Sequence, residues 1–239
     1  MAASQDIIAW LVPTARNTPA DKATRLSANT PLTVSTSSSA YLASRLPTLP
    51  GTPQTAIQLA FTHRARRPAS FTLGSDPNHC DVLLPGLGIS KQHCAIGFDA
   101  QSRLILDDFS ESGTQVWYDW ACNGDQRDYS WVLSSGAGDG FPSAVQRIAL
   151  DIQGVRFLVI VNDHSADWEG YRRRVDAFCE QLPRESGCLT APWDADAAWY
   201  VEQPMIQHVF VKGQAGEPSG DVYLWDTSRP WEPMVKASA

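Results

Sequence analysis

Residues 71–119 read FTLGSDPNHCDVLLPGLGISKQHCAIGFDAQSRLILDDFSESGTQVWYD, and this stretch decides the fold class. Short runs in which apolar residues alternate with others, such as Phe71 to Leu73 and Cys94 to Phe98, are typical of β-strands. Turn-forming pairs stand between the runs, for example Pro85-Gly86 and Ser112-Gly113. The stretch therefore predicts a β-sandwich or barrel built from short strands.

The strand pattern continues on both sides of this stretch. Further strands are predicted at Ile57 to Phe61, Trp131 to Leu133, Ile148 to Ile152 and Phe157 to Val161. Gln153-Gly154 separates the last two of these runs, and a two-residue loop of this kind predicts a tight hairpin.

The apolar period changes after Asn162, which indicates a helix. Large apolar residues then recur at spacings of three and four, namely Trp168, Tyr171, Val175, Phe178 and Leu182. Asp163 or Ser165 is the predicted helix cap, and Pro183 ends the helix. We expect a helix within residues 163–183 that docks its apolar stripe on the sandwich.

The N-terminal part divides into a strand and a segment of different composition. Residues 1–12 contain an apolar run that predicts one strand. Residues 13–54 are rich in Ser, Thr, Pro and Ala and have few large apolar side chains, so a flexible segment is predicted there. Residues 184–203 are predicted to form a linker.

The composition limits the possible function classes. Of the 239 residues, 43% are hydrophobic, which is enough for a packed core, and the net charge is −7. This acidic balance argues against a nucleic-acid partner, and the apolar runs are too short for a membrane partner. An odd number of cysteines, five, without a CxxC motif predicts free thiols and an intracellular, cytoplasmic or nuclear location.

Residues 55–162 resemble a forkhead-associated (FHA) domain. The residues that carry the resemblance, in order, are Gly74, Cys80-Asp81-Val82, Ser90-x-x-His93, Asp108-x-Ser110 and Gly113-Thr114. The resemblance implies a β-sandwich whose loops at one end bind phosphothreonine peptides. The predicted fold is thus mostly β: an FHA-like antiparallel sandwich with one C-terminal helix and a small β-rich extension.

The resemblance also implies a role for each matching residue. The hydroxyl of Ser90 would donate to the phosphate, and Lys91 would add a positive charge at the rim. The complete predicted phosphopeptide site is Ser90, Lys91, Ser75, Ser112 and Thr114. The predicted structural residues are Gly74 at a tight turn, His93 behind the loop and Gly113 in the turn beside the phosphate.

The predicted site departs from the family pattern in two places. Ser75 stands where the family has an Arg that clamps the phosphate, and Ser112 stands where it has an Asn that holds the peptide backbone. Asp76 and Glu111 place two carboxylates near the rim. A charged hydrogen bond contributes roughly 1.5–3 kcal/mol, so loss of the Arg predicts at least about tenfold weaker binding. One hypothesis is that Lys91 or the Arg66-Arg67 pair replaces part of this charge.

The C-terminal residues suggest a second, weaker resemblance. GSDPNHCDV, GISKQHC and YRRRVDAFCEQ look like the FHA domains that precede fungal Ser/Thr kinase domains. Residues 204–239 resemble a degenerate kinase N-lobe, with the glycine-rich loop at residues 213–220 and the third-strand lysine at Lys236. No HRD or APE motif occurs, and the letters that approximate DFG, at residues 108–110, lie inside the sandwich pattern. We therefore expect no catalysis.

The leading function is a non-enzymatic, phosphothreonine-dependent interaction module in intracellular signalling. The alternatives are a phosphate-independent scaffold that keeps the fold and a non-catalytic remnant of an FHA-kinase. No cofactor and no metal is predicted. The adjacent pairs His79-Cys80 and His93-Cys94 would point to opposite faces of a strand, which does not suit a zinc site.

Overall fold

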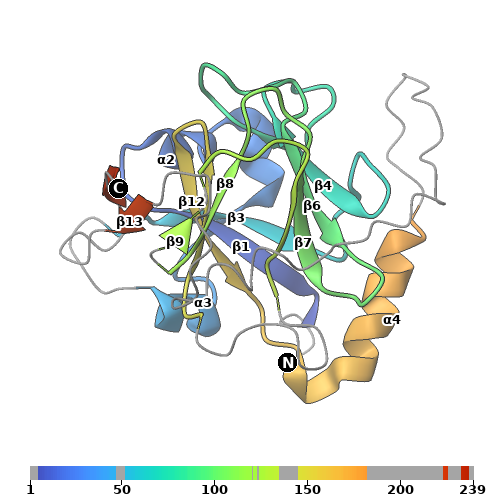
Figure 1. The fold of residues 1–239 in the computed structure, drawn as a ribbon. Helices are drawn as coiled ribbons and strands as arrows, with labels where there is room; N and C mark the ends of the chain where they lie inside the picture. Colours follow the sequence, from blue (N-terminus) through green and yellow to red (C-terminus); the bar gives the residue numbers. More distant parts are fainter. Residues whose placement is uncertain are drawn as a thin grey trace, which may run out of the picture.

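The computed structural model describes residues 5–46, 52–119, 121–122, 124–134 and 145–181, and the backbone of residues 223–225 and 233–236. Two β-sheets pack face to face, and one long helix lies along the side of the sandwich (Figure 1). The predicted fold class, mostly β with one helix after the sandwich, is confirmed.

The first sheet has nine antiparallel strands in the order β14-β13-β9-β8-β11-β12-β1-β3-β2. In chain order the strands are β1 Ile7–Pro13, β2 Thr33–Ser35, β3 Thr55–Ala60, β8 Gln115–Tyr118, β9 Ala121–Cys122, β11 Ile148–Ile152, β12 Val155–Val161, β13 Tyr223–Trp225 and β14 Pro233–Lys236. The predicted hairpin is confirmed, because Gln153 and Gly154 join β11 to β12 with φ angles of 49° and 86°.

The second sheet has five strands in the order β10-β7-β6-β4-β5. The strands are β4 Ser70–Gly74, β5 Val82–Leu83, β6 Cys94–Phe98, β7 Leu104–Asp108 and β10 Ser130–Val132. β5 runs parallel to β4, and the other pairs are antiparallel.

The main core lies between the two sheets. Leu73 and Leu106 of the second sheet and Ile57, Leu150 and Phe157 of the first sheet are fully buried in one cluster. Because alternate residues of a strand face the same side, the alternating sequence pattern places these apolar side chains inside.

The first strand is central to the sandwich. β1 pairs with β12 on one side and with β3 on the other. The sandwich therefore includes a strand that the sequence analysis placed outside residues 55–162. Trp10 of β1 is fully buried on the sheet face opposite the main core, in a second apolar cluster.

Residues 13–46 carry short regular elements, which differs from the flexible segment predicted there. They form α2 (Pro19–Ala23), η1 (Ser27–Leu32, a 3-10 helix), β2 and α3 (Ala40–Arg45). Thr18 caps α2 and Ser39 caps α3 through their side-chain oxygens. Leu42 of α3 is fully buried in the cluster around Trp10. In this segment Ser and Thr thus serve as helix caps, and a few well-placed apolar residues are sufficient for packing.

The predicted helix forms over part of its range. α4 spans Trp168–Cys179 and follows the short η2 helix (Ser165–Asp167). Its cap is Asp167, whose Oδ1 accepts from the N–H of Gly170 at 3.0 Å, and not Asp163 or Ser165. Asp163 instead accepts from Ser165 N at the start of η2.

The apolar stripe of α4 packs on the second sheet, as predicted (Figure 1). The ring of Phe178 stacks on Phe71 with centroids 5.2 Å apart, and the hydroxyl of Tyr171 donates to Ser102 O at 2.9 Å. Leu182, the last residue of the predicted stripe, lies outside the described residues.

The C-terminal strands extend the first sheet. β13 and β14 lie in the predicted β-rich extension, where they pair with each other, and β13 also pairs with β9. The predicted linker at residues 184–203 and the predicted glycine-rich loop at residues 213–220 lie outside the described residues. Cys80, Cys94, Cys122 and Cys179 are free thiols, while Cys188 falls outside the described part. Among the described helices, none has the length and apolar character to cross a membrane.

Candidate functional site

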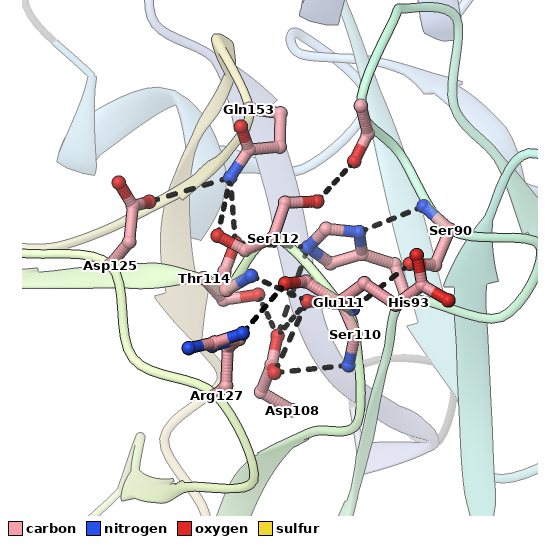
Figure 2. Close-up of polar contacts among 12 residues, drawn as sticks. Ser90, His93, Asp108, Ser110, Glu111, Ser112, Thr114, Asp125, Arg127 and Gln153 are labelled. Atoms are coloured by element: carbon pink, nitrogen blue, oxygen red, sulfur yellow. Dashed lines mark hydrogen bonds and ion pairs between the residues drawn. The ribbon is translucent and has the colours of Figure 1, made fainter.

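Three loops meet beside the ends of β4, β6 and β7. They are residues 75–81 after β4, residues 84–93 between β5 and β6, and residues 109–114 between β7 and β8. Side-chain hydrogen bonds connect the loops to one another, and Figure 2 shows those around Ser90 and Ser112. All of the predicted site residues lie in or directly beside these loops.

His93 joins two of the loops from the buried side. Its Nδ1 accepts from the N–H of Ser90 at 3.1 Å, and its Nε2 lies 3.2 Å from the carbonyl oxygen of Gly113. This pair of contacts requires the neutral ring with its proton on Nε2. Burial lowers the pKa of His93, although the bond to Gly113 and the charge of Asp108 offset this in part. The contacts agree with a supporting role for His93.

Asp108 organises the loop 109–114. Its carboxylate accepts from the N–H and the hydroxyl of Ser110, and from the hydroxyl of Thr114 at 2.5 Å. The Ser110 oxygen in turn accepts from Gly113 N at 2.8 Å. Thr114 is fully buried and its hydroxyl is directed at Asp108 (Figure 2), so this predicted site residue supports the loop from inside.

Two glycines allow the loops to approach closely. A Cβ atom at Gly74 would lie 2.4 Å from the carbonyl oxygen of Lys91, which is too close for any other residue. Gly113 has a φ of +84°, in the left-handed region that favours glycine. The predicted turn residues therefore have a steric reason to be glycine.

The two serines that depart from the family pattern hold the same loop. The Ser75 hydroxyl donates to the carbonyl oxygens of Ile89 and Ser90 at 3.0 and 3.2 Å. The Ser112 hydroxyl donates to the carbonyl oxygen of Gly88. Both hydroxyl protons are therefore directed at the backbone of residues 88–90, where they fix the loop on which Ser90 lies.

Ser90 is half-buried, and its oxygen is oriented by the neighbouring loop. Ser90 Oγ accepts from the N–H of Glu111 at 3.3 Å. A hydroxyl that accepts one hydrogen bond retains its own proton for a further acceptor. Lys91 follows directly and is exposed. The site thus offers an oriented hydroxyl donor next to a positive charge.

Gln153 and Arg127 belong to the site although sequence reasoning missed them. Gln153 Nε2 donates to the carbonyl oxygens of Ser112 and Gly113 at 3.1 and 2.9 Å (Figure 2). Arg127 Nη1 donates to the carbonyl oxygen of Glu111 at 3.4 Å. The sequence signal that could have found Gln153 is its place before Gly154 in the predicted hairpin turn. Asn, Asp or Gly is usual at that position, and a longer polar side chain is unusual there. No sequence signal marked Arg127.

The remaining predicted cations have other contacts. Arg66 Nη1 donates to the carbonyl oxygen of Asn78 at 2.8 Å, and the Arg67 guanidinium lies 5.0 Å above the ring of Phe109. The carboxylate of Asp76 accepts from Asn78 N and lies 2.8 Å from the His79 ring. In the described part of the chain, no three His, Cys, Asp or Glu side chains form a group that could hold a metal ion.

The FHA domain family model matches residues 71–137, which contain all three loops. The resemblance of this segment to an FHA domain is confirmed, and the FHA-like sandwich is the fold of the described residues. The match does not extend to residues 204–236.

Several solved FHA domains are similar to this chain at low identity. One is the MEK1 FHA domain in complex with a HOP1 phosphothreonine peptide, with 20% identity, a TM-score of 0.30 and coverage of 45% of this chain and 89% of that chain. The N-terminal FHA domain of Rad53p from S. cerevisiae, in complex with a phosphothreonine peptide, has 20% identity, a TM-score of 0.30 and coverage of 56% and 94%. The FHA domain of CT664 protein from Chlamydia trachomatis has 20% identity, a TM-score of 0.29 and coverage of 45% and 84%. A comparison with curated protein sequences finds no match.

Proposed function

We propose that this chain recognises phosphothreonine-containing proteins through the Ser90 loop, as a non-catalytic interaction module in intracellular signalling. The observation that carries the proposal is the arrangement of Ser90, whose oxygen accepts from Glu111 N while its backbone N–H bonds to buried His93. The Ser90 hydroxyl is therefore positioned before a ligand arrives, and little conformational entropy is lost when it binds a phosphate.

The phosphate would rest mainly on Ser90 and Lys91. The hydroxyl protons of Ser75 and Ser112 already point to loop carbonyls, so they can donate to a phosphate only if those hydrogen bonds break. Lys91 is an exposed point charge and lacks the paired donors of an arginine. We therefore propose modest, strongly salt-dependent affinity for a phosphopeptide.

A phosphate-independent scaffold is the second candidate. The hydroxyls of Ser75 and Ser112 favour this candidate, because they already bond to loop carbonyls without a ligand. The exposed Glu111, which follows Ser110 in the loop next to Ser90, also favours it. Such a protein would bind its partner equally well with and without phosphate.

Titration with a degenerate phosphothreonine peptide library and with its unphosphorylated counterpart separates the two candidates. We expect binding that needs the phosphate and falls at least about tenfold in Ser90→Ala, because a charged hydrogen bond is lost. Ser44→Ala is the matched control, since the Ser44 hydroxyl bonds only within α3 at Tyr41 O. Equal binding of both libraries at low ionic strength would leave only the scaffold function.

A further inference from the structure

Glu111 has a fixed position beside the proposed phosphate-binding hydroxyl. Its backbone N–H donates to Ser90 Oγ at 3.3 Å, and its carbonyl oxygen accepts from Arg127 at 3.4 Å. The side chain is exposed and lies beside Ser90 in Figure 2. The residue therefore belongs to the rim of the Ser90 site, and its backbone position puts the carboxylate within reach of the Ser90 hydroxyl.

A peptide phosphate that accepts from the Ser90 hydroxyl would be repelled by the nearby negative charge of Glu111. A phosphate oxygen that accepts from Ser90 Oγ would lie about 2.5–3.0 Å from it, and the backbone N–H of Glu111 donates to the same Oγ atom. The Glu111 side chain can therefore bring its carboxylate close to the phosphate, within the Debye length of about 8 Å at physiological salt, where salt does not screen out their repulsion. A peptide with phosphate as its only charge is consequently disfavoured.

The cations of the rim do not pair with this carboxylate, since none of the ion pairs among the described residues includes Glu111. The pKa of Asp76 is lowered chiefly by hydrogen bonds from Asn78 and His79 and in small part by the charge of Lys91, so Asp76 is a second negative charge near Lys91. Arg127 donates to the backbone of Glu111 itself. The whole chain has a net charge of −7. A complementary positive charge is best supplied by the ligand.

We propose that Glu111 is a specificity-determining residue that selects phosphothreonine peptides with a Lys or Arg within two positions of the phosphothreonine. This inference rests on the proposed phosphothreonine recognition. An extended peptide advances about 3.3 Å per residue, so a long basic side chain one or two positions away reaches the rim next to the phosphate. The basic side chain then pairs with Glu111 and offsets its repulsion of the phosphate.

The test is a double-mutant cycle between Glu111 and the peptide. Phosphothreonine peptides with a single Arg at each of the two positions before and after the phosphothreonine are compared with an all-Ala peptide, using the wild type and Glu111→Gln. We expect the wild type to prefer one Arg peptide by about threefold, the range of an exposed ion pair, and Glu111→Gln to lose this preference. Glu111→Gln should also bind the all-Ala phosphopeptide about threefold more tightly.

Asp176→Asn is the matched control, because it removes one exposed carboxylate from α4, outside the three loops. This variant should keep the preference for the Arg peptide. Any change in its affinity should be the same for all peptides and should disappear when salt is added. Phosphate-dependent binding with the same Arg preference in the wild type and Glu111→Gln would overturn this inference alone. Binding that ignores the phosphate in both proteins would overturn the proposed function, and this inference with it.

Discussion

The serine hydroxyls of the site differ in where their protons are directed. Ser75 and Ser112 donate to carbonyl oxygens of residues 88–90, whereas Ser90 accepts a hydrogen bond and retains its proton for a ligand. At the scale of single residues, the two departures from the family pattern therefore have a structural role. Their hydroxyls fix the loop on which Ser90 lies.

Restoring the family's arginine is a direct test of this interpretation. In Ser75→Arg, we expect phosphopeptide binding to strengthen about tenfold, because position 75 is exposed and a guanidinium adds paired, charged donors. Ser75→Ala is the control, since it removes the loop hydrogen bonds without adding a charge. It should weaken binding and lower the free energy of unfolding by about 1 kcal/mol.

Isothermal titration with one phosphothreonine peptide and its unphosphorylated form measures both variants. If the affinity for the unphosphorylated peptide also rises tenfold, the new arginine does not contact the phosphate. The proposed position of the phosphate would then be wrong.

At the scale of elements, the segment before β3 completes the sandwich. The amide of Asn29 in η1 is fully buried, and it donates to the carbonyl oxygens of Ala23 and Leu83 and accepts from Leu83 N, each at 2.8 Å. β5 is the edge strand of the second sheet, so one side chain supplies the pairing that a further strand would otherwise provide.

Replacement of Asn29 should show whether this pairing stabilises the fold. We expect Asn29→Ala to lower the free energy of unfolding by about 2–3 kcal/mol, because the carbonyl oxygens of Ala23 and Leu83 and the N–H of Leu83 lose their partner. Ser27→Ala, at an exposed position of the same 3-10 helix, should change it by less than about 0.5 kcal/mol. Urea denaturation gives both values, and equal values for the two variants would argue against a bridging role for η1.

At the scale of the whole molecule, histidines with a lowered pKa make stability depend on pH. Burial is the main cause of a lowered pKa at His63, His93 and His164. His93 is the most enclosed of the three, with Asp108 and Asp125 as the nearby carboxylates, and its Nδ1 must stay unprotonated to accept from Ser90.

The sign of the effect follows from proton linkage. A histidine whose pKa is lower in the folded chain than its unfolded value of about 6.5 binds more protons when unfolded. Stability is therefore complete above about pH 6.5 and decreases as the pH falls below that value. We expect a slope of up to about 1.4 kcal/mol per pH unit from His93.

Urea denaturation between pH 7.5 and about pH 5 measures this slope, and His93→Gln is the matched variant that cannot titrate. The raised pKa values of Asp107 and Asp125 have the opposite effect on stability, because the folded chain gains stability as these carboxyls bind protons at lower pH. Both carboxyls are present in the wild type and in His93→Gln. A pH dependence identical in the wild type and His93→Gln would rule out the assigned role of His93.

The features that depend on local sequence could be predicted. Alternation within strands, the two-residue hairpin at Gln153-Gly154 and the three- and four-residue spacing of α4 are determined by neighbours along the chain. The loop residues Gly74, Ser90 and His93 could be located because they carry the resemblance to the FHA family. The structure places each of these residues at the meeting point of the three loops.

Contacts between distant segments needed the tertiary structure. The sequence alone gave no reason for β1 to pair between β12 and β3, or for Asn29 to bridge to Leu83. Likewise, Gln153 reaches Gly113 from a hairpin turn that is forty positions away in the chain. Composition predicts a flexible segment wherever large apolar residues are few. It does not show that the buried amide of Asn29 and the capping hydroxyls of Thr18 and Ser39 order residues 13–46. Local sequence thus predicts most of the strands, the long helix and the loop motif. The orientation of the Ser75, Ser90 and Ser112 hydroxyls follows only from the tertiary structure, because hydrogen bonds between the loops direct them.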